Sequence, residues 1–370
     1  MPPGLVLGIP TQLSPFIKTG LISPLGKARA GLDLLIPARK EEGDEALGAF
    51  LQRRLGREVA ENIAEPLLSG IYAGDTQMLS LDATFPQFKA IEKKYGSIIK
   101  GMLFSRKGGG APPQPQAILP QAARQSMFLT YRNGLETLVK SLVKELSGVD
   151  IQTNQSVQQI TAGQTGYEIL MGNGEKALAD AIILASPAFA TREMLKDVDM
   201  ASCLSEIPYV SVANVALAFN RKDINHPLDG SGFVIPRNEG RSITACTWTS
   251  SKWPQSTPSD KVLLRCYMGH SRDQSAITLT DEEIMGKVRK DLKEIMGLTA
   301  QPIFYRITRW KESMPQYRVN HLERLRQLRE ELEKKRPGIL LAGAGYEGVG
   351  IPDCIQQGKQ AALKVFEHLS

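Results

Sequence analysis

The sequence of 370 residues predicts a mixed α/β (α+β) fold that combines a helical part with an antiparallel sheet. Apolar residues recur at helical spacing in the first third of the chain, whereas they alternate with polar residues from Val149 to about residue 269. Near the C-terminus, a short apolar strand is followed by glycines and then by a helix. The length suits more than one domain, and the hydrophobic fraction of 42% is ordinary for a protein with a packed core.

Composition and charge exclude several classes of protein. No apolar run approaches the roughly 20 residues of a membrane-spanning helix, and the N-terminal stretch "MPPGLVLGIPTQLSPF" lacks the basic region of a signal peptide. We therefore expect a cytoplasmic or peripheral protein. The net charge of +6 suits an anionic ligand, an anionic surface or nucleic acid. No basic stretch interleaved with aromatic residues favours nucleic acid, so a solvated basic surface is the simplest interpretation.

The cysteines and histidines form no metal-binding pattern. Four cysteines and four histidines are scattered along the sequence, without a CxxC pair or a ligand spacing. Reduced, buried thiols are the simplest interpretation, and we expect no metal site.

The first 75 residues contain a broken apolar segment with basic side chains, followed by a predicted helix. Prolines and glycines divide residues 2–44 into short pieces, which could lie on a membrane surface, form a tunnel wall or form an ordinary domain edge, the interpretation that we prefer. Residues 46–68 have the apolar spacing of one amphipathic helix. The following "PLLSGIYAGD" contains glycines that let the backbone approach another group closely, although Gly70 could equally be a helix C-cap.

The middle of the sequence contains turn and strand signals. "RKGGGAPPQPQ", from Arg106, is the clearest loop, and a helix is expected from about Gly134. From Val149, the segments "DIQTNQSVQQI", "GYEILMGNGEKALAD" and "AIILA" have the period-two pattern or apolar character of strands. Further strands between residues 209 and 269 predict an antiparallel-rich sheet.

Two helices and a strand follow this sheet. Thr280 and Glu283 have the spacing of a capping box at the start of a helix. "PIFYRITRW" is typical of a strand that ends at Trp310. Leucines at helical spacing then predict a helix that stops before Pro337.

The stretch "GILLAGAGYEGVG", from Gly338 to Gly350, contains the pattern G-x-G-x-x-G between a predicted strand and a predicted helix. A complete dinucleotide-binding unit needs a further parallel strand with an acidic residue about 20 residues on, which this stretch lacks. A tight turn with close helix packing would give the same pattern. The loop also suits the last part of a larger site, because a helix N-terminus can face a flavin edge or a phosphate. Pro352 is placed for the first turn of that helix.

Five sequence blocks, spread over nearly the whole chain, resemble one enzyme family. They are "EPLLSGIYAGD", "FPQFKAIEKKYGSIIKGM", "SVANVALAF", "RWKESMPQY" and "AGAGYEGVGIPDCIQQGKQAA". The sequence resembles the oxygen-dependent protoporphyrinogen/coproporphyrinogen III oxidases, which are FAD-dependent enzymes of heme biosynthesis, and most of all their Gram-positive type. The last block is similar to the flavin-binding signature of that family.

Two features depart from the family pattern. Family members begin with a strand, a G-x-G-x-x-G loop, a helix and an acidic residue for the FAD ribose, and no such unit precedes the matching blocks. We therefore expect the N-terminal Rossmann part, the FAD-binding βαβ unit, to be missing. Asn320 precedes His321 where the family commonly has glycine.

The resemblance implies an FAD-linked oxidase fold of the p-hydroxybenzoate hydroxylase/amine oxidase type. It has an antiparallel-sheet substrate domain and a helical membrane-associating domain. The implied boundaries are a helical substrate- and membrane-associating domain at 1–125, an FAD-domain segment at 126–208, a substrate-binding sheet domain at 209–305 and a C-terminal FAD-domain segment at 306–370.

The resemblance also implies site residues. For catalysis it points to the backbone carbonyl of Gly70 and the apolar side chain of Ile71, both beside the flavin. For substrate binding it points to Val234, Thr247 and Tyr267. For FAD it points to Val157, in a hairpin on which the family packs the adenine, and to Trp310, Gly345, Gly350, Ile351 and Pro352. Without the resemblance, Val157 and Trp310 would be interpreted as core residues.

The implied reaction is oxidation of coproporphyrinogen III to coproporphyrin III, or of protoporphyrinogen IX to protoporphyrin IX. O2 is the oxidant and H2O2 is released, over three two-electron steps. The resemblance allows a ferrochelatase-type pathway partner, peripheral contact with the cytoplasmic membrane face and a homo-oligomer, and it implies no nucleic acid.

Two alternatives stay open at this point. The chain could be a truncated, non-catalytic fragment of that enzyme, because the N-terminal phosphate loop is missing. It could also be a flavin amine oxidase of the same fold, since one fold supports several reactions; the block "SGIYAGD" disfavours this alternative.

Overall fold

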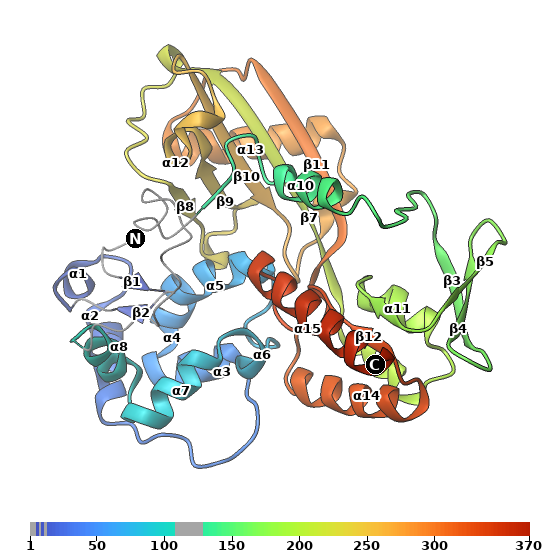
Figure 1. The fold of residues 1–370 in the computed structure, drawn as a ribbon. Coiled ribbons are helices and arrows are strands. Elements are labelled where there is room, and N and C mark those ends of the chain that lie inside the picture. Colours follow the sequence, from blue (N-terminus) through green and yellow to red (C-terminus); the bar gives the residue numbers. More distant parts are fainter. Residues whose placement is uncertain (1–4, 7–8, 11–12, 108–128) are drawn as a thin grey trace.

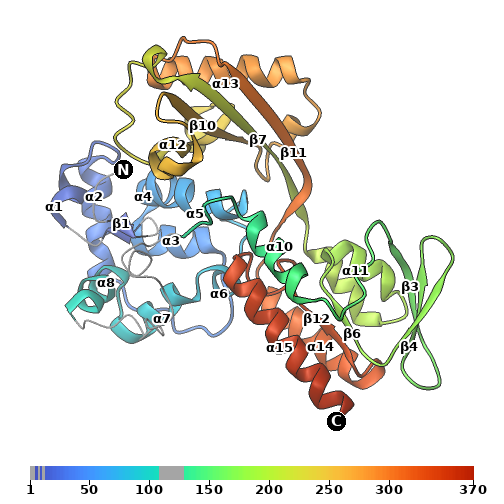
Figure 2. The same cartoon turned by 45° about the horizontal axis from the view of Figure 1, so that its top comes forward.

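A computed structural model describes residues 5–6, 9–10, 13–107 and 129–370. It contains a helical part built from the N-terminal residues, a five-stranded antiparallel sheet, and a third part with the C-terminus (Figure 1). In both views the helical part and the third part lie below the large sheet (Figure 2). The predicted α/β (α+β) class is therefore confirmed. The loop predicted at 106–116 lies outside the described residues, apart from Arg106 and Lys107.

Short helices form the N-terminal part. Its elements are β1 (Leu5–Val6), β2 (Ile9–Pro10), α1 (Leu13–Lys18), α2 (Pro24–Gly31), η1 (Leu32–Leu34), α3 (Leu47–Leu55), α4 (Arg57–Val59), η2 (Ala60–Ala64), α5 (Glu65–Tyr72), α6 (Leu81–Thr84), α7 (Pro86–Tyr95) and α8 (Ile98–Lys107).

The single helix predicted over residues 46–68 is wrong, because four consecutive segments, α3, α4, η2 and α5, replace it. Gly56 separates α3 from α4 at φ +84°, a conformation that glycine adopts without steric cost. Beyond it, the backbone widens into the π-helix η2 just before Pro66. Proline has no N–H to donate and its ring crowds the preceding turn, so a wider turn accommodates it.

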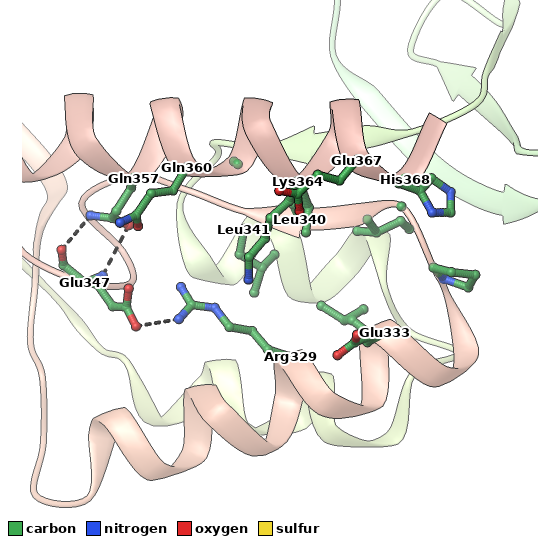
Figure 3. Close-up of a pocket in the computed structure, with 15 residues that line it drawn as sticks. Arg329, Glu333, Leu340, Leu341, Glu347, Gln357, Gln360, Lys364, Glu367 and His368 are labelled. Atoms are coloured by element: carbon green, nitrogen blue, oxygen red, sulfur yellow. Dashed lines mark hydrogen bonds and ion pairs between the residues drawn. The ribbon is translucent and has the colours of Figure 1, made fainter. Parts of the chain in front are cut away.

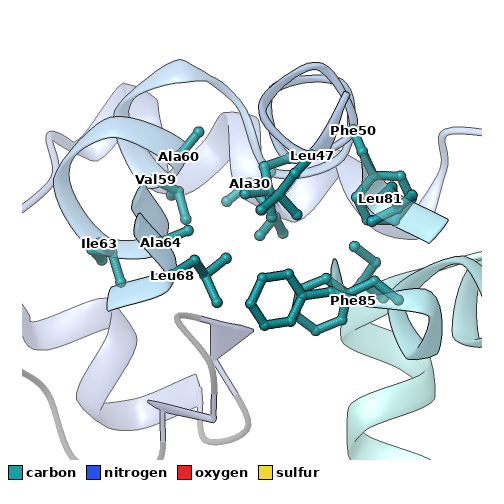
Figure 4. Close-up of a cluster of buried hydrophobic side chains, with 14 of the residues drawn as sticks. Ala30, Leu47, Phe50, Val59, Ala60, Ile63, Ala64, Leu68, Leu81 and Phe85 are labelled. Atoms are coloured by element: carbon teal, nitrogen blue, oxygen red, sulfur yellow. The ribbon is translucent and has the colours of Figure 1, made fainter. Parts of the chain in front are cut away.

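Buried apolar side chains from these helices form one core (Figure 4). Phe50 and Phe85 each stack on Phe88, with ring centroids 6.4 and 5.5 Å apart. Tyr72, at the end of α5, meets Tyr317 edge to face at 5.8 Å. Since Tyr317 follows the last strand of the large sheet, this contact fixes the end of α5 against the rest of the protein.

The large sheet has the strand order β11-β7-β10-β9-β8, and all neighbours are antiparallel. Its strands are β7 (Tyr209–Asn220), β8 (Gly232–Val234), β9 (Ile243–Trp248), β10 (Lys261–Met268) and β11 (Phe304–Pro315). The predicted sheet between residues 209 and 269 is confirmed, and β11 extends it. Helix α13 (Asp281–Met296) packs on one face and begins with the predicted capping box of Thr280 and Glu283. Short elements join the strands: η4 (Arg221–Asp223), η5 (Arg237–Glu239), α12 (Thr249–Lys252), η6 (Pro254–Ser256) and η7 (Ser275–Ile277).

The third part brings together distant segments of the chain. Strands β6 (Ile182–Leu184) and β12 (Ile339–Leu341) pair in parallel, and β3 (Val157–Ala162), β4 (Tyr167–Met171) and β5 (Lys176–Ala179) form a separate sheet. Its helices are α11 (Ala188–Met194), η3 (Asp199–Glu206), α14 (His321–Lys335) and α15 (Ile351–Leu369). Helix α10 (Glu136–Glu145) has no buried residue and lies apart from β3, β4 and β5 in both views. The strand expected from Val149 begins only at Val157, whereas α10, α14 and α15 lie where helices were predicted.

Among the residues that the structure places, no helix is long and apolar enough to cross a membrane. Nor do these residues include a group of three or more His, Cys, Asp or Glu side chains that could hold a metal ion. All four thiols are free: Cys246 and Cys266 are buried, and Cys203 and Cys354 are half-buried.

Candidate functional site

A cavity of about 650 Å³ lies between helix α5 and the large sheet. Pro66, Leu67 and Gly70 line it from the helical part. All five strands of the sheet contribute to the opposite wall, with residues that include Asn214 of β7 and Ser313 of β11. The cavity therefore joins two parts of the protein that are distant in sequence.

Five residues singled out from the sequence line this one cavity. They are Gly70, Val234, Thr247, Tyr267 and Trp310. They come from α5, β8, β9, β10 and β11, so folding rather than proximity along the chain brings them together. Their individual roles stay predictions.

Strand alternation explains which side chains reach the cavity. Successive side chains of a strand point to opposite faces of the sheet. Thr247 and Tyr267 line the cavity, whereas Cys246 and Cys266, one position away, are paired across β9 and β10 and buried in the core beneath α13. The sheet thus separates a face that lines the cavity from a face that packs in the core beneath α13.

Gly232 allows β8 to approach β9 closely enough to place Val234 on the cavity. It has φ +134°, and a Cβ at this position would lie 2.0 Å from the carbonyl oxygen of Cys246. Only glycine tolerates that approach and that backbone conformation. The short strand that carries Val234 therefore depends on this residue.

Gly70 presents backbone rather than a side chain to the cavity. It lies in the last turn of α5, where carbonyl groups have no partner within the helix. The C-cap is Ala73 at φ 50°, so the alternative that Gly70 caps the helix is wrong. Gln316 donates to the carbonyl of Tyr72 at 2.7 Å, and no atom lies within 4 Å of where a Cβ on Gly70 would be. A hydrogen bond from a ligand to the Gly70 carbonyl stays a prediction. Ile71 is 42% exposed and is not among the lining residues.

The glycine loop between β12 and α15 is held by side chains. Gln357 accepts from the N–H groups of Gly343 and Glu347 at 3.1 and 3.4 Å, and donates to the Glu347 carbonyl at 2.6 Å. The Tyr317 hydroxyl donates to the carbonyl of Ala344 at 2.6 Å. Gly345 is buried, and a Cβ there would lie 2.6 Å from the Tyr209 hydroxyl oxygen. The amides of Gly343 and Glu347 are therefore engaged within the protein, as a tight, closely packed turn requires.

The start of α15 lies beside the end of α5 (Figure 1). Gly350 is the N-cap, its N–H donates to Asp353 at 3.3 Å, and Pro352 lies in the first turn as predicted. Burial, and then the charge of Asp353, raise the pKa of Tyr72 to about 12. The predicted residues Gly350, Ile351 and Pro352 are thus close to the end of the helix that carries Gly70.

The residues at this junction fit a flavin. Ile71, Trp310 and Ile351 are large apolar side chains that are 42%, 55% and 47% exposed. Exposed apolar side chains suit the faces of a flat ring system, and the N-terminus of α15 suits its electron-rich edge. These residues, with Gly350, are the ones that would hold the ring.

Val157 lies apart from this cavity. It begins strand β3 of the predicted hairpin and pairs with Met171. In both views, the sheet that contains β3 lies beyond α11, away from α5 (Figures 1 and 2). The hairpin is confirmed, and an adenine contact at Val157 stays a prediction.

A different cavity of about 420 Å³ lies between α14, α15 and β12 (Figure 3). Glu347 pairs with Arg329 and accepts from Gln357 across it. None of the site residues predicted from the sequence lines it.

Sequence reasoning did not identify Arg237 and His270, two basic side chains that line the cavity between α5 and the large sheet. Each lies three residues after a predicted substrate residue, Val234 and Tyr267 respectively. Their position shortly after a strand that lines the cavity is the signal in the sequence that could have identified them.

His321 links the glycine loop to α14 and makes stability depend on pH. Its ring is 1% exposed, stacks on Tyr317 at 4.3 Å and bonds through Nε2 to the Tyr346 carbonyl at 2.6 Å. Burial lowers the pKa of His321 to about 4, from an ordinary value near 6.5. Between these values the unfolded chain binds more protons, so stability is present above pH 6.5 and is lost as pH falls toward 4.

We expect His321 to account for about 3 kcal/mol of stability lost between pH 7 and pH 4. Urea unfolding at several pH values should show a smaller loss in His321→Gln, whose amide can still donate to Tyr346. His368→Gln, at an exposed position of the last helix, is the matched control. An unchanged pH dependence in His321→Gln would contradict this assignment.

Comparisons with known proteins agree with this fold. The family described as flavin containing amine oxidoreductase matches residues 2–365. The chain is 44% identical to the coproporphyrinogen III oxidase of Bacillus subtilis (strain 168), over 100% of this chain and 77% of that protein. It is 40% identical to the coproporphyrinogen III oxidase of Staphylococcus aureus (strain NCTC 8325 / PS 47), over 100% of this chain and 79% of that protein. A crystal structure from Exiguobacterium sp. 255-15, provisionally named a protoporphyrinogen oxidase, superposes with a TM-score of 0.85 at 34% sequence identity. The match covers 100% of this chain and 77% of that one.

Proposed function

This chain belongs to the flavin-containing amine oxidoreductase family, and we propose that it is an FAD-dependent porphyrinogen oxidase of heme biosynthesis. As a member of that family it is an oxidoreductase that uses a flavin. The proposed substrate is coproporphyrinogen III, which O2 oxidises to coproporphyrin III with release of H2O2. The observation that carries the proposal is the cavity that joins Gly70 to Val234, Thr247 and Tyr267 beside Trp310.

The bound flavin supplies a two-electron acceptor for hydrogen from the carbon bridges of the substrate. The residues of the chain bind and orient that substrate. Val234, Thr247 and Tyr267 form a wall for one pyrrole ring, and the Gly70 carbonyl accepts a pyrrole N–H on the opposite side. Ile71, Trp310 and Ile351 would hold the flavin ring.

Peripheral contact with the cytoplasmic membrane face is part of the same proposal. The side chains of Ile17, Leu25 and Leu35, on or next to α1, α2 and η1, are 61%, 81% and 79% exposed. Lys18 and Lys27 lie among them in the sequence. Exposed apolar side chains with neighbouring lysines suit the surface of an anionic bilayer.

Titration of the purified chain with FAD tests the proposed function. We expect saturable quenching of flavin fluorescence and a higher melting temperature, because a ligand that binds only the folded state stabilises it. The flavin-loaded protein should then convert coproporphyrinogen III to a fluorescent porphyrin and consume O2. Flavin binding without any porphyrinogen oxidation would exclude this function, and amines would be the next substrates to test.

A further inference from the structure

Arg237 occupies a position between two cavities. It lines the cavity that contains Gly70, and it also lines a neighbouring cavity of about 590 Å³. One terminal nitrogen of its guanidinium, Nη2, donates to the Gly74 carbonyl. The other, Nη1, lies 3.2 Å from Glu65 but makes no hydrogen bond among the residues that the structure describes, although it is buried. The charge of Arg237 is thus paired with Glu65, but an N–H of its guanidinium lacks an acceptor at the junction of the two cavities.

His270 supplies a second donor in the same cavity. Its Nδ1 accepts the backbone N–H of Arg272 at 3.2 Å, so in the neutral ring the proton is on Nε2. Burial, and then the charge of Arg237, lower the pKa of His270, which keeps the ring neutral at pH 7. Within the described ranges no protein group accepts from Nε2. Its N–H is therefore free to meet a ligand.

The neighbouring cavity is polar and has room for a flexible side chain of a ligand. Its walls include the amides of Gln52, Gln77 and Asn238 and the guanidinium groups of Arg237 and Arg272. The carboxylates of Glu61 and Glu65 also line it. Arg272 is held by Asp75 at 2.8 Å and is thus already neutralised. Guanidinium and amide donors of this kind recognise carboxylates.

We propose that Arg237 and His270 together bind one carboxylate of a tetrapyrrole substrate where the two cavities meet. The proposal rests on the proposed function and names the residues that recognise the acidic edge of that substrate. A carboxylate at this point accepts hydrogen bonds from the unused N–H groups of both side chains. It also fixes which edge of the ring system faces the polar cavity.

Glu65 weakens this binding through its negative charge, and that effect provides a test of the proposal. Its carboxylate already lies beside Arg237 and belongs to the helix that carries Gly70. Burial raises the pKa of Glu65, although the charge of Arg237 opposes that shift. A second carboxylate at Arg237 meets electrostatic repulsion from Glu65. Removing the charge of Glu65 should therefore strengthen carboxylate binding, an effect that a folding defect cannot imitate.

Equilibrium binding of coproporphyrin III, a tetracarboxylate, and of its uncharged tetramethyl ester tests the assignment. Quenching of porphyrin fluorescence by the full chain gives both dissociation constants. We expect Arg237→Gln to weaken coproporphyrin binding at least about tenfold, because a charge-assisted hydrogen bond is lost. His270→Phe should weaken it about threefold or more, and Glu65→Gln should strengthen it by a similar factor. Binding of the ester should stay the same in all three variants.

Arg241→Gln is the matched control, because Arg241 lies in the same connection between β8 and β9 but pairs with Glu294 away from both cavities. It should bind both porphyrins as the unmodified chain does. The carboxylate site would be overturned if Arg237→Gln weakened binding of the ester and of the acid equally. It would also be overturned if Glu65→Gln did not strengthen binding of the acid. Either result would leave the proposed function intact. An unmodified chain that binds neither porphyrin would overturn both.

Discussion

Replacement of Arg54 by methionine is expected to lower the free energy of unfolding by about 3–5 kcal/mol. Arg54 is 0% exposed, and its Nε donates to the Asp33 carboxylate at 2.5 Å. It also donates to the carbonyl groups of Asp33, Ile36 and Gly96 at 2.7–2.9 Å. Methionine fills much of the space but leaves a buried carboxylate without its cation, and such a charge is costly in a medium of low polarity.

Far-UV circular dichroism during urea unfolding measures this loss in the helical part. Arg57→Met is the matched control, because Arg57 pairs with Glu61 at 2.7 Å on the surface, with 81% of its side chain exposed. An exposed pair is worth little, so we expect this control to change stability by less than about 0.5 kcal/mol. Equal effects of the two substitutions would show that the Arg54–Asp33 pair does not stabilise the helical part.

The parts of the fold that could be predicted are those in which local pattern and tertiary packing agree. The strands of the large sheet alternate in sequence because one face packs on α13 and the other faces the cavity. The capping box at Thr280 could likewise be predicted from the sequence, because it is a contact between residues three positions apart. The helix predicted over 46–68 failed because apolar spacing does not distinguish a continuous helix from one interrupted at Gly56 and widened before Pro66.

The candidate site was predictable only in part, for a similar reason. Gly70, Val234, Thr247, Tyr267 and Trp310 meet in one cavity, as their resemblance to family positions implied. Arg237 begins the short element η5 and His270 lies in the connection after β10, and both segments are too short for a periodic pattern to indicate where a side chain lies. Their importance comes from unused donors beside a cavity, which only the three-dimensional arrangement reveals.

The largest expected effect on activity comes from Gly70→Ala. Gly70 is inside helix α5, and no atom lies within 4 Å of the position where the added methyl group would stand. Alanine should therefore stabilise the helix by about 0.5–1 kcal/mol. The same methyl group extends into the space where the substrate has to approach the Gly70 carbonyl. Overpacking there should cost about 1–3 kcal/mol of transition-state binding, so kcat/KM should fall about ten- to hundredfold.

Stability and activity thus move in opposite directions at Gly70, which a merely structural glycine would not show. Gly286→Ala is the matched control, since Gly286 is also exposed within a helix, α13, and has no atom within 4 Å of its added Cβ. It should gain similar stability and keep full activity. Melting temperatures and initial rates of porphyrin formation compare the two variants directly. A Gly70→Ala protein with unchanged kcat/KM would mean that the substrate does not approach this turn of α5, and the reacting end of the cavity would have to be sought elsewhere along the sheet.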